Sequence, residues 1–435
     1  MPSLEAERSA ERAGDQLKQK SVQLRTWRLL FVHEHCGDFG GAEANISLAA
    51  GELRRRGHAV GLLYERGTTR NEQRWREVFN PCVQLPAHGK LDLLKDTLHE
   101  FRPHLVYLHK LADVELIEVL LQAGVPLVRM VHDHSLVCLR SYKYNYFTRE
   151  ICHRPASLFC LFPCLASFQR NTTGTLPLQW ASYTGKRREI NLTKTCDALV
   201  VYSEYQKQEL ERNGFTASQI QICVPVRPAS HPSPASSFGP QNVLLYVGQI
   251  IRGKGVDVLL EALAKVKVPF VCNIVGGGNH QAYCERLCVQ LKLNDRVRFW
   301  GYVPPAQLES FYLEASAFLM SSLWPEPFGM SGPEAMRYGL PVVAFDAGGI
   351  REWLKDGENG FLVPWKDADA FAGRVEELLC EKSLARRMGL RGQEWVKQYD
   401  PVRQIDGLEA LFSRLIQGAN SGLGQRSAEA GLIGV

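Results

Sequence analysis

The chain has 435 residues, of which 45% are hydrophobic and 22% charged. This length exceeds what one hydrophobic core usually supports, so we expect two or three domains, and the composition excludes disordered, collagen-like and coiled-coil proteins. The formal net charge of +5 is too small to indicate a nucleic-acid-binding protein. It fits an anionic small ligand or a membrane surface equally well.

In chain order, a polar arm comes first. Residues 1–24 have mixed charge and lack the apolar segment of a secretory signal, and no apolar run approaches the ~20 residues of a membrane-spanning helix. We therefore expect a flexible arm on a cytoplasmic protein whose 12 cysteines are reduced. Basic runs at 54–56 and 186–188 could contact the inner face of a membrane, although a solvated surface explains them as well.

The next part of the chain alternates strand and helix patterns. Apolar runs predict strands at 27–33, 58–64, 104–109 and 126–131, and the pattern at 42–56 is typical of a helix. Such alternation predicts a parallel sheet covered by helices on both faces, which we assign to a domain over residues 25–227.

A stretch rich in proline and serine predicts an interdomain linker over residues 228–241. The alternation then restarts and predicts a second domain over residues 242–398. Its expected strands are 243–248, 270–275, 296–302, 317–323, 341–345 and 360–363, and its expected helices include 256–267 and 281–293. A last helix, 399–417, is expected to return to the first domain, followed by a disordered tail over 418–435.

The predicted fold class is therefore α/β, with two Rossmann-like, doubly wound domains facing an interdomain cleft. Ligands of such domains bind at the carboxyl ends of the strands.

The segment 323–352 is the most informative part of the sequence. It places Glu326 just after a predicted strand, Glu334 eight residues later, and a glycine turn with Glu352 after the next strand. Ser331 is a natural N-cap, so a helix N-terminus with free N–H groups would face the cleft and could bind a phosphate. Alternatively, Ser331 and Glu334 form a capping box and Glu326 is a solvated loop carboxylate.

This pattern resembles the Glu-x7-Glu motif of the retaining family 4 glycosyltransferases, which have the GT-B fold, and the resemblance covers roughly residues 26 to 415. It implies that Glu334 binds the ribose hydroxyls of a nucleotide and that Glu326 contacts the donor sugar. It also implies that the backbone between them holds a diphosphate and that the following glycine turn adds to the donor site. The residues of these two segments are Phe328, Gly329, Met330 and Ser331, and then Gly349 and Glu352.

Two cations follow the first strand of the predicted second domain. Arg252 and Lys254 would stabilise the negative charge that develops on a departing nucleoside diphosphate. Lys254 matches a lysine of the family. The family's arginine is replaced by Gln249, and Arg252 either takes over its role or is solvated.

Three glycine turns resemble donor-contacting loops of the family. They contain Gly248, Gly276 and the pair Gly40-Gly41, and tight packing between strand and helix is the alternative for each. His132 matches a family histidine beside the donor sugar, so we expect it to orient the substrate or to stabilise an oxocarbenium-like centre. The resemblance implies no dedicated nucleophile, because the donor phosphate helps to deprotonate the acceptor, and no metal is expected to be required for catalysis.

Four cysteines, Cys138, Cys152, Cys160 and Cys164, fall in one irregular stretch of the predicted first domain. Four thiolates could form a tetrahedral structural zinc site, and the stretch resembles a cysteine-containing insertion of some bacterial-type family members. Free or packed thiols, a disulfide and an iron–sulfur cluster are the alternatives. Because the stretch lies on the acceptor side, it would influence the choice of acceptor.

These features together predict a retaining glycosyltransferase that moves a sugar from a nucleotide-diphosphate sugar to a glycan or lipid-linked acceptor. By resemblance, the product is a cell-surface polysaccharide or a glycolipid. The alternatives are another activity of the same fold, such as a sugar-nucleotide epimerase or a sugar-phosphate synthase, and a non-catalytic scaffold that binds a nucleotide sugar. No readable motif encodes the donor base, the sugar, the acceptor, the linkage or the oligomeric state.

Overall fold

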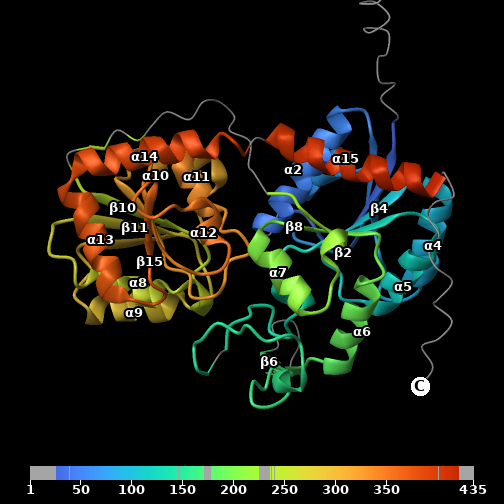
Figure 1. Cartoon of the computed structure of the whole chain (residues 1–435), viewed down its shortest axis with the longest axis horizontal. Coiled ribbons are helices and arrows are strands. Elements are labelled where there is room, and N and C mark those ends of the chain that lie inside the picture. Colours follow the sequence, from blue (N-terminus) through green and yellow to red (C-terminus); the bar gives the residue numbers. More distant parts are fainter. Residues whose placement is uncertain are drawn as a thin grey trace, which may run out of the picture.

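The computed structural model describes residues 26–38, 40–145, 147–170, 178–224, 236, 238–239, 241–399 and 401–420. The predicted arm and most of the predicted linker and tail lie outside these residues. Two α/β domains lie side by side in the described part of the chain (Figure 1). The predicted fold class is confirmed.

The first domain is built on a seven-stranded parallel sheet with the strand order β3-β2-β1-β4-β5-β8-β9. The strands are β1 (Arg28–Cys36), β2 (Ala59–Gly67), β3 (Cys82–Gln84), β4 (Leu105–Leu108), β5 (Leu127–Met130), β8 (Ala198–Val201) and β9 (Ile220–Ile222). The helices are α2 (Gly41–Arg55), α3 (Glu72–Val78), α4 (Lys90–Phe101), α5 (Val114–Gln122), α6 (Tyr183–Thr193) and α7 (Glu204–Arg212). Every residue of β4, β5 and β8 is buried, as expected for a parallel sheet covered on both faces.

The second domain has a six-stranded parallel sheet with the order β12-β11-β10-β13-β14-β15. The strands are β10 (Val243–Val247), β11 (Val271–Val275), β12 (Val297–Gly301), β13 (Ala317–Met320), β14 (Val342–Phe345) and β15 (Gly360–Val363). The helices are α8 (Val256–Leu263), α9 (Gln281–Gln290), α10 (Pro305–Glu314), α11 (Ser331–Arg337), α12 (Ile350–Trp353), α13 (Ala368–Cys380) and α14 (Lys382–Val396).

The last helix, α15 (Pro401–Asn420), returns to the first domain and lies beside α2 (Figure 1). Arg56 pairs with Asp406 at 2.6 Å, and His58 Nε2 lies 2.6 Å from Glu409 Oε1. The ring of Phe412 packs edge-on against Tyr107 of β4. The predicted return of the chain is thus confirmed, and the helix continues past the expected end at residue 417.

An irregular insertion, residues 138–182, connects β5 with α6. It contains a short 3-10 turn, η2 (Leu158–Cys160), and an antiparallel pair, β6 (Phe168–Arg170) and β7 (Leu178–Trp180). Figure 1 shows this segment, in teal, below the first domain and reaching toward the second.

Candidate functional site

The strand order of each sheet reverses direction at one point, and ligands of doubly wound sheets bind at such points. In the second domain the reversal lies between the neighbouring strands β10 and β13. The loop after β10 carries Lys254, and the loop after β13 carries Glu326. The two side chains therefore meet at the carboxyl edge of the sheet.

Lys254 and Glu326 form a closely bonded pair. Glu326 is only 4% exposed, and its Oε1 atom lies 2.6 Å from Lys254 Nζ. The same oxygen accepts hydrogen bonds from Trp324 Nε1, at 2.8 Å, and from the Ser322 hydroxyl. The ammonium group also lies 4.9 Å from the centre of the Trp324 ring, a cation–π contact. Both charged groups are thus fixed in position before any ligand binds.

Trp324 and Ser322 belong to the candidate site, and the sequence analysis missed them. Neither belongs to the Glu-x7-Glu spacing, and their polar atoms become relevant only because the loop folds back on Glu326. One indication of the Trp324 contact was present in the sequence, namely a tryptophan two residues before the loop carboxylate Glu326.

The loop between the two motif carboxylates departs from the predicted capping. Ser331 is not the N-cap: α11 begins at this residue, and Met330 before it already has helical dihedrals, with φ −50° and ψ −35° and no side-chain cap. The reason is Gly329, whose φ of +87° reverses the chain immediately before the helix. The capping-box alternative is therefore wrong.

The same loop leaves backbone donors for a ligand. Among the residues that the structure describes, the N–H groups of Phe328, Gly329 and Met330 have no protein acceptor. The Phe328 side chain is buried, and its carbonyl accepts a bond of 2.6 Å from Trp353 Nε1. Glu334 is half-buried on α11. The contacts of these residues with a donor stay predictions.

The second glycine turn ties the motif to the first domain. The Gly349 N–H donates to the Glu326 carbonyl at 2.8 Å, which fixes the Glu326 backbone. The Glu352 carboxylate accepts bonds from the backbone N–H groups of Glu204 and Tyr205, at 3.0 and 2.8 Å, and thereby caps α7 of the first domain. The contact of Glu352 with a donor stays a prediction. Both of its carboxylate oxygens already accept hydrogen bonds from the first domain.

His132 lies at the carboxyl end of β5, within a buried hydrogen-bond chain. Asn45 Nδ2 donates to Tyr202 Oη, so we assign the Tyr202 proton to His132 Nδ1, at 2.6 Å. His132 Nε2 then donates to His109 Nδ1, at 2.9 Å. Burial lowers the pKa of His132 to about 3. A neutral His132 can orient a substrate by hydrogen bonding only if it exchanges one of these two bonds.

The loop after β5 reaches the motif in the second domain. His134 Nε2 lies 2.9 Å from the carbonyl oxygen of Pro325, the residue next to Glu326. The Ser203 hydroxyl also donates to the Pro327 carbonyl. The structure therefore brings the loop that carries His132 close to the Lys254–Glu326 pair, across the boundary between the domains.

Comparison with known families agrees with this geometry. Residues 39–223 match the family described as Glycosyltransferase Family 4, and residues 231–395 match Glycosyl transferases group 1. Both halves of the chain are glycosyltransferase domains.

Sequence relatives match over limited stretches. The lipopolysaccharide core biosynthesis glycosyltransferase LpsE of Rhizobium meliloti is 32% identical over 35% of this chain and 44% of its own length. A GDP-mannose-dependent phosphatidylinositol monomannoside mannosyltransferase of Mycolicibacterium smegmatis is 31% identical over 36% of this chain and 44% of its own length. The matches thus span under half the length of these two curated relatives.

Among solved structures, HepE of Anabaena, in complex with UDP and glucose, aligns with a TM-score of 0.69. The identity is 19%, and the alignment covers 89% of this chain and all of HepE. This likeness shows that the glycosyltransferase domains are arranged in the GT-B fold. None of the helices in the described ranges has the length and apolar character needed to cross a membrane.

The remaining loops that are predicted to contact a donor pack tightly. Gly276 has a φ of +127°, and a Cβ atom there would overlap the carbonyl oxygen of Gly248. The close packing of these two loops therefore requires glycine. Gly40 precedes α2 in the first domain. In the second domain, Arg252 is half-buried and lies two residues before Lys254. Their roles toward a donor stay predictions.

The end of β1 and the first turn of α2 together form a candidate cation site. In the described part of the chain, donor atoms of His33, His35 and Glu43 lie within 4.8 Å of one another. However, the Lys110 backbone N–H donates to His33 Nδ1 at 3.3 Å, which leaves the ring proton on Nε2. Nε2 then donates to Glu43 Oε1 at 3.3 Å and has no lone pair for a metal. We therefore interpret the group as a hydrogen-bonded pair with a neighbouring histidine.

The four cysteines of the insertion are free and half-buried. Burial and the neighbouring thiols raise the pKa of Cys160. Among the residues that the structure describes, no three of the sulfur atoms meet the 4.8 Å separation that His33, His35 and Glu43 meet. Zinc at Cys138, Cys152, Cys160 and Cys164 therefore stays a prediction, which rests on the thiol donor set alone.

The insertion contacts the second domain as well as its own. The Tyr142 ring packs against Trp324, with ring centres 5.3 Å apart. Arg149 Nη2 bonds Asp257 Oδ2 at 2.8 Å, and Asp257 lies in the first turn of α8, close to Lys254. The influence of the insertion on acceptor choice stays a prediction. The structure adds that the insertion also contacts the second domain.

We expect Arg149→Ala to destabilise the protein by about 2–3 kcal/mol, because it removes the ion pair of the buried Asp257 carboxylate and leaves only His280 Nε2 nearby, at 3.7 Å. The double variant with Asp257→Asn should recover about 1–2 kcal/mol of that loss. Urea unfolding of the four proteins in this cycle measures the coupling, with the exposed Arg154→Ala as the control. Purely additive effects would show that the two side chains do not interact.

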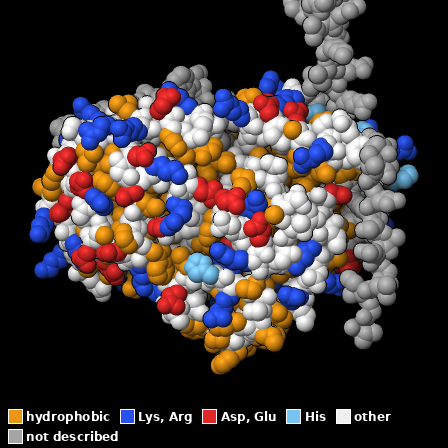
Figure 2. Space-filling view, viewed as in Figure 1, with side chains coloured by type: hydrophobic (Ala, Val, Ile, Leu, Met, Phe, Trp, Pro, Cys, Tyr) orange, Lys and Arg blue, Asp and Glu red, His pale blue; other side chains and the backbone are white. Residues whose placement is uncertain are grey.

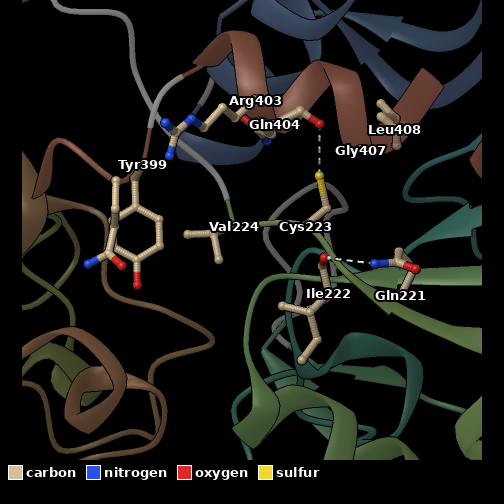
Figure 3. A pocket seen from close by; sticks show the side chains of 10 residues that line it. Gln221, Ile222, Cys223, Val224, Tyr399, Arg403, Gln404, Gly407 and Leu408 are labelled. Atoms are coloured by element: carbon tan, nitrogen blue, oxygen red, sulfur yellow. Dashed lines mark hydrogen bonds between the residues drawn. The ribbon is translucent and has the colours of Figure 1, made fainter. Parts of the chain in front are cut away.

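An open hollow lies elsewhere, where the chain returns from the second domain to the first (Figure 3). Residues after β9 and at the start of α15 line it, and Cys223 Sγ donates to the Gln404 carbonyl across it at 3.5 Å. None of the predicted site residues lines this hollow. We therefore place the candidate site at the strand ends of the second domain. The Lys254–Glu326 pair lies there, as do the N–H groups of residues 328–330, which have no acceptor in the described part of the chain.

Proposed function

We propose that this protein is a retaining glycosyltransferase that transfers a sugar from a nucleoside-diphosphate sugar to a glycan or lipid-linked acceptor. The observation that carries the proposal is the Lys254–Glu326 pair at the reversal point of the second sheet, next to the loop that carries His132. The relatives that take part in lipopolysaccharide core synthesis or act as a mannosyltransferase support a product of polysaccharide or glycolipid type.

In this mechanism the donor diphosphate lies against Lys254 and the free N–H groups of residues 328–330. As the bond between sugar and phosphate breaks, negative charge grows on the leaving oxygen, and the preplaced ammonium group stabilises it without further reorganisation. The acceptor hydroxyl approaches from the same face and passes its proton to the departing phosphate oxygen. The sugar therefore keeps its anomeric configuration, and no metal is required.

Thermal unfolding in the presence of UDP, GDP, ADP, CMP and dTDP tests the donor site. A ligand at 100 times its dissociation constant should stabilise the protein by about 2.7 kcal/mol. Glu334→Ala should abolish the shift, whereas Glu358→Ala, on an exposed turn, should retain it. If none of the nucleotides shifts the unfolding temperature, the donor-site proposal fails and a scaffold without nucleotide binding becomes the better interpretation.

The stereochemical part has a separate test. Proton NMR of the first product formed should show the anomeric configuration of the donor. Activity should be unchanged by a chelator of divalent cations. An inverted product would overturn the retaining mechanism while leaving the donor site intact.

A further inference from the structure

The insertion exposes several large apolar side chains on one protruding part of the molecule. We call this group the apolar tip; it consists of Leu158, Phe162, Leu165, Phe168 and Trp180. Phe162 is 77% and Trp180 66% exposed. Figure 2 shows hydrophobic side chains gathered at the bottom of the molecule, where Figure 1 places the insertion.

Hydrogen bonds and a ring contact hold the backbone of the tip in its exposed arrangement. Arg140 Nη2 donates to the carbonyl oxygens of Cys164 and Leu165, at 3.2 and 2.9 Å. The Ala166 N–H donates to the Cys160 carbonyl at 2.8 Å. The rings of Phe168 and Trp180 pack edge-on, with centres 5.1 Å apart, across the β6–β7 pair. Exposure of the tip is therefore a property of the fold.

The segments that carry the tip are rich in lysine and arginine. Residues 138–168 and 180–188 contain seven lysines and arginines and a single acidic residue, Glu150, whereas the whole chain has a net charge of only +5. Acidic residues of other segments or of α6 form ion pairs with Lys143, Arg149, Lys186 and Arg188. Arg154 and Arg187 are exposed, and neither side chain forms an ion pair within the described part of the chain. Exposed aromatic and aliphatic side chains flanked by cations are typical of surfaces that bind anionic lipid headgroups and enter the interfacial layer.

We propose that the apolar tip docks the protein on an anionic bilayer. A protruding group of side chains fits a fluid lipid surface better than it fits the concave pocket of a protein, and Trp180 suits the headgroup layer. Tyr142 of the same insertion touches Trp324 beside Glu326. Docking would therefore hold the candidate site close to lipid-linked acceptors, and this last consequence rests on the proposed function.

The experiment is co-sedimentation of the full chain with vesicles of equimolar phosphatidylglycerol and phosphatidylcholine, and with phosphatidylcholine vesicles alone. We expect binding to the anionic vesicles that weakens as salt is added. Leu158→Ser/Phe162→Ser should weaken it at least about tenfold. Val289→Ser/Leu390→Ser, which removes two apolar side chains of similar exposure from α9 and α14, should leave it unchanged.

Every outcome bears on the proposal. Equal binding by the two double variants, or no binding of the wild type to anionic vesicles, would overturn it. Self-association that sedimentation velocity detects in the wild type and not in the tip variant would also overturn it, because the tip would then be a contact between copies. The nucleotide-induced thermal shift should be the same in the tip variant and the wild type. This measurement therefore distinguishes a failure of the docking proposal from a failure of the donor-site proposal. Arg187→Gln, at an exposed position, tests the charge contribution without touching the tip.

Discussion

Replacing Lys254 with alanine is expected to lower kcat/KM by about 10²–10³, which corresponds to about 3–4 kcal/mol of transition-state stabilisation. The ammonium group is fixed by Glu326 Oε1 at 2.6 Å and by the Trp324 ring, so it needs no reorganisation when charge develops on the leaving phosphate. Initial rates with the nucleotide sugar identified by thermal shift measure the effect.

The matched control is Lys265→Ala, which removes an exposed lysine that pairs with the exposed Asp369. Its kcat/KM should match the wild type. Trp324→Phe should lower kcat to a smaller degree, because it keeps the ring and removes only the bond to Glu326. A fall of less than about threefold for Lys254→Ala would remove this residue from the mechanism.

Acidification should destabilise the protein well before its carboxylates are protonated. Burial lowers the pKa values of His109, His132 and His134, and that of His132 to about 3. Unfolded histidine takes up its proton near pH 6.5, whereas the folded protein keeps these rings neutral. The stability that the neutral rings provide is therefore complete above about pH 6.5 and is lost toward lower pH, by about 1.4 kcal/mol per pH unit for each ring.

The comparison of His109→Asn with the wild type isolates one of these rings. The urea midpoint of the variant should fall less steeply between about pH 6.5 and 4.5, while His153→Asn, at an exposed position, should keep the wild-type slope. The variant is needed because burial raises the pKa values of Glu65 and Glu352, which act in the opposite sense. Equal slopes for His109→Asn and the wild type would show that the His109 ring is charged in the folded protein.

Much of the fold was predictable because its signals are local. Apolar runs followed by helical patterns indicated the strands, and β15 (Gly360–Val363) has the predicted bounds. The predictions are wrong at the ends of some elements. The helix predicted over 256–267 ends at Leu263, and the first strand continues to Cys36. Element ends depend on caps and contacts that a periodic pattern does not contain.

The candidate site was predictable only in part. Lys254 and Glu326 could be placed at one sheet edge because each follows a strand. The predicted N-cap role of Ser331 was wrong because the dihedrals of Gly329 decide where α11 begins, whereas the contact of Ser331 with a donor stays a prediction. The role of Glu352 at α7 was not foreseen, because its partners Glu204 and Tyr205 lie almost 150 residues earlier in the chain.

The sequence by itself determined the two doubly wound domains, the carboxylate and lysine motif, and the strand ends at which the site lies. All of these follow from the order of neighbouring residues, since burial of one face sets the periodicity of each helix and strand. Only the tertiary structure decided what these residues bond to: Trp324 with Glu326, His109 and Tyr202 with His132, and the insertion with the donor domain. Such contacts join distant segments and depend on how the sheets and domains pack, which no local pattern in the chain specifies.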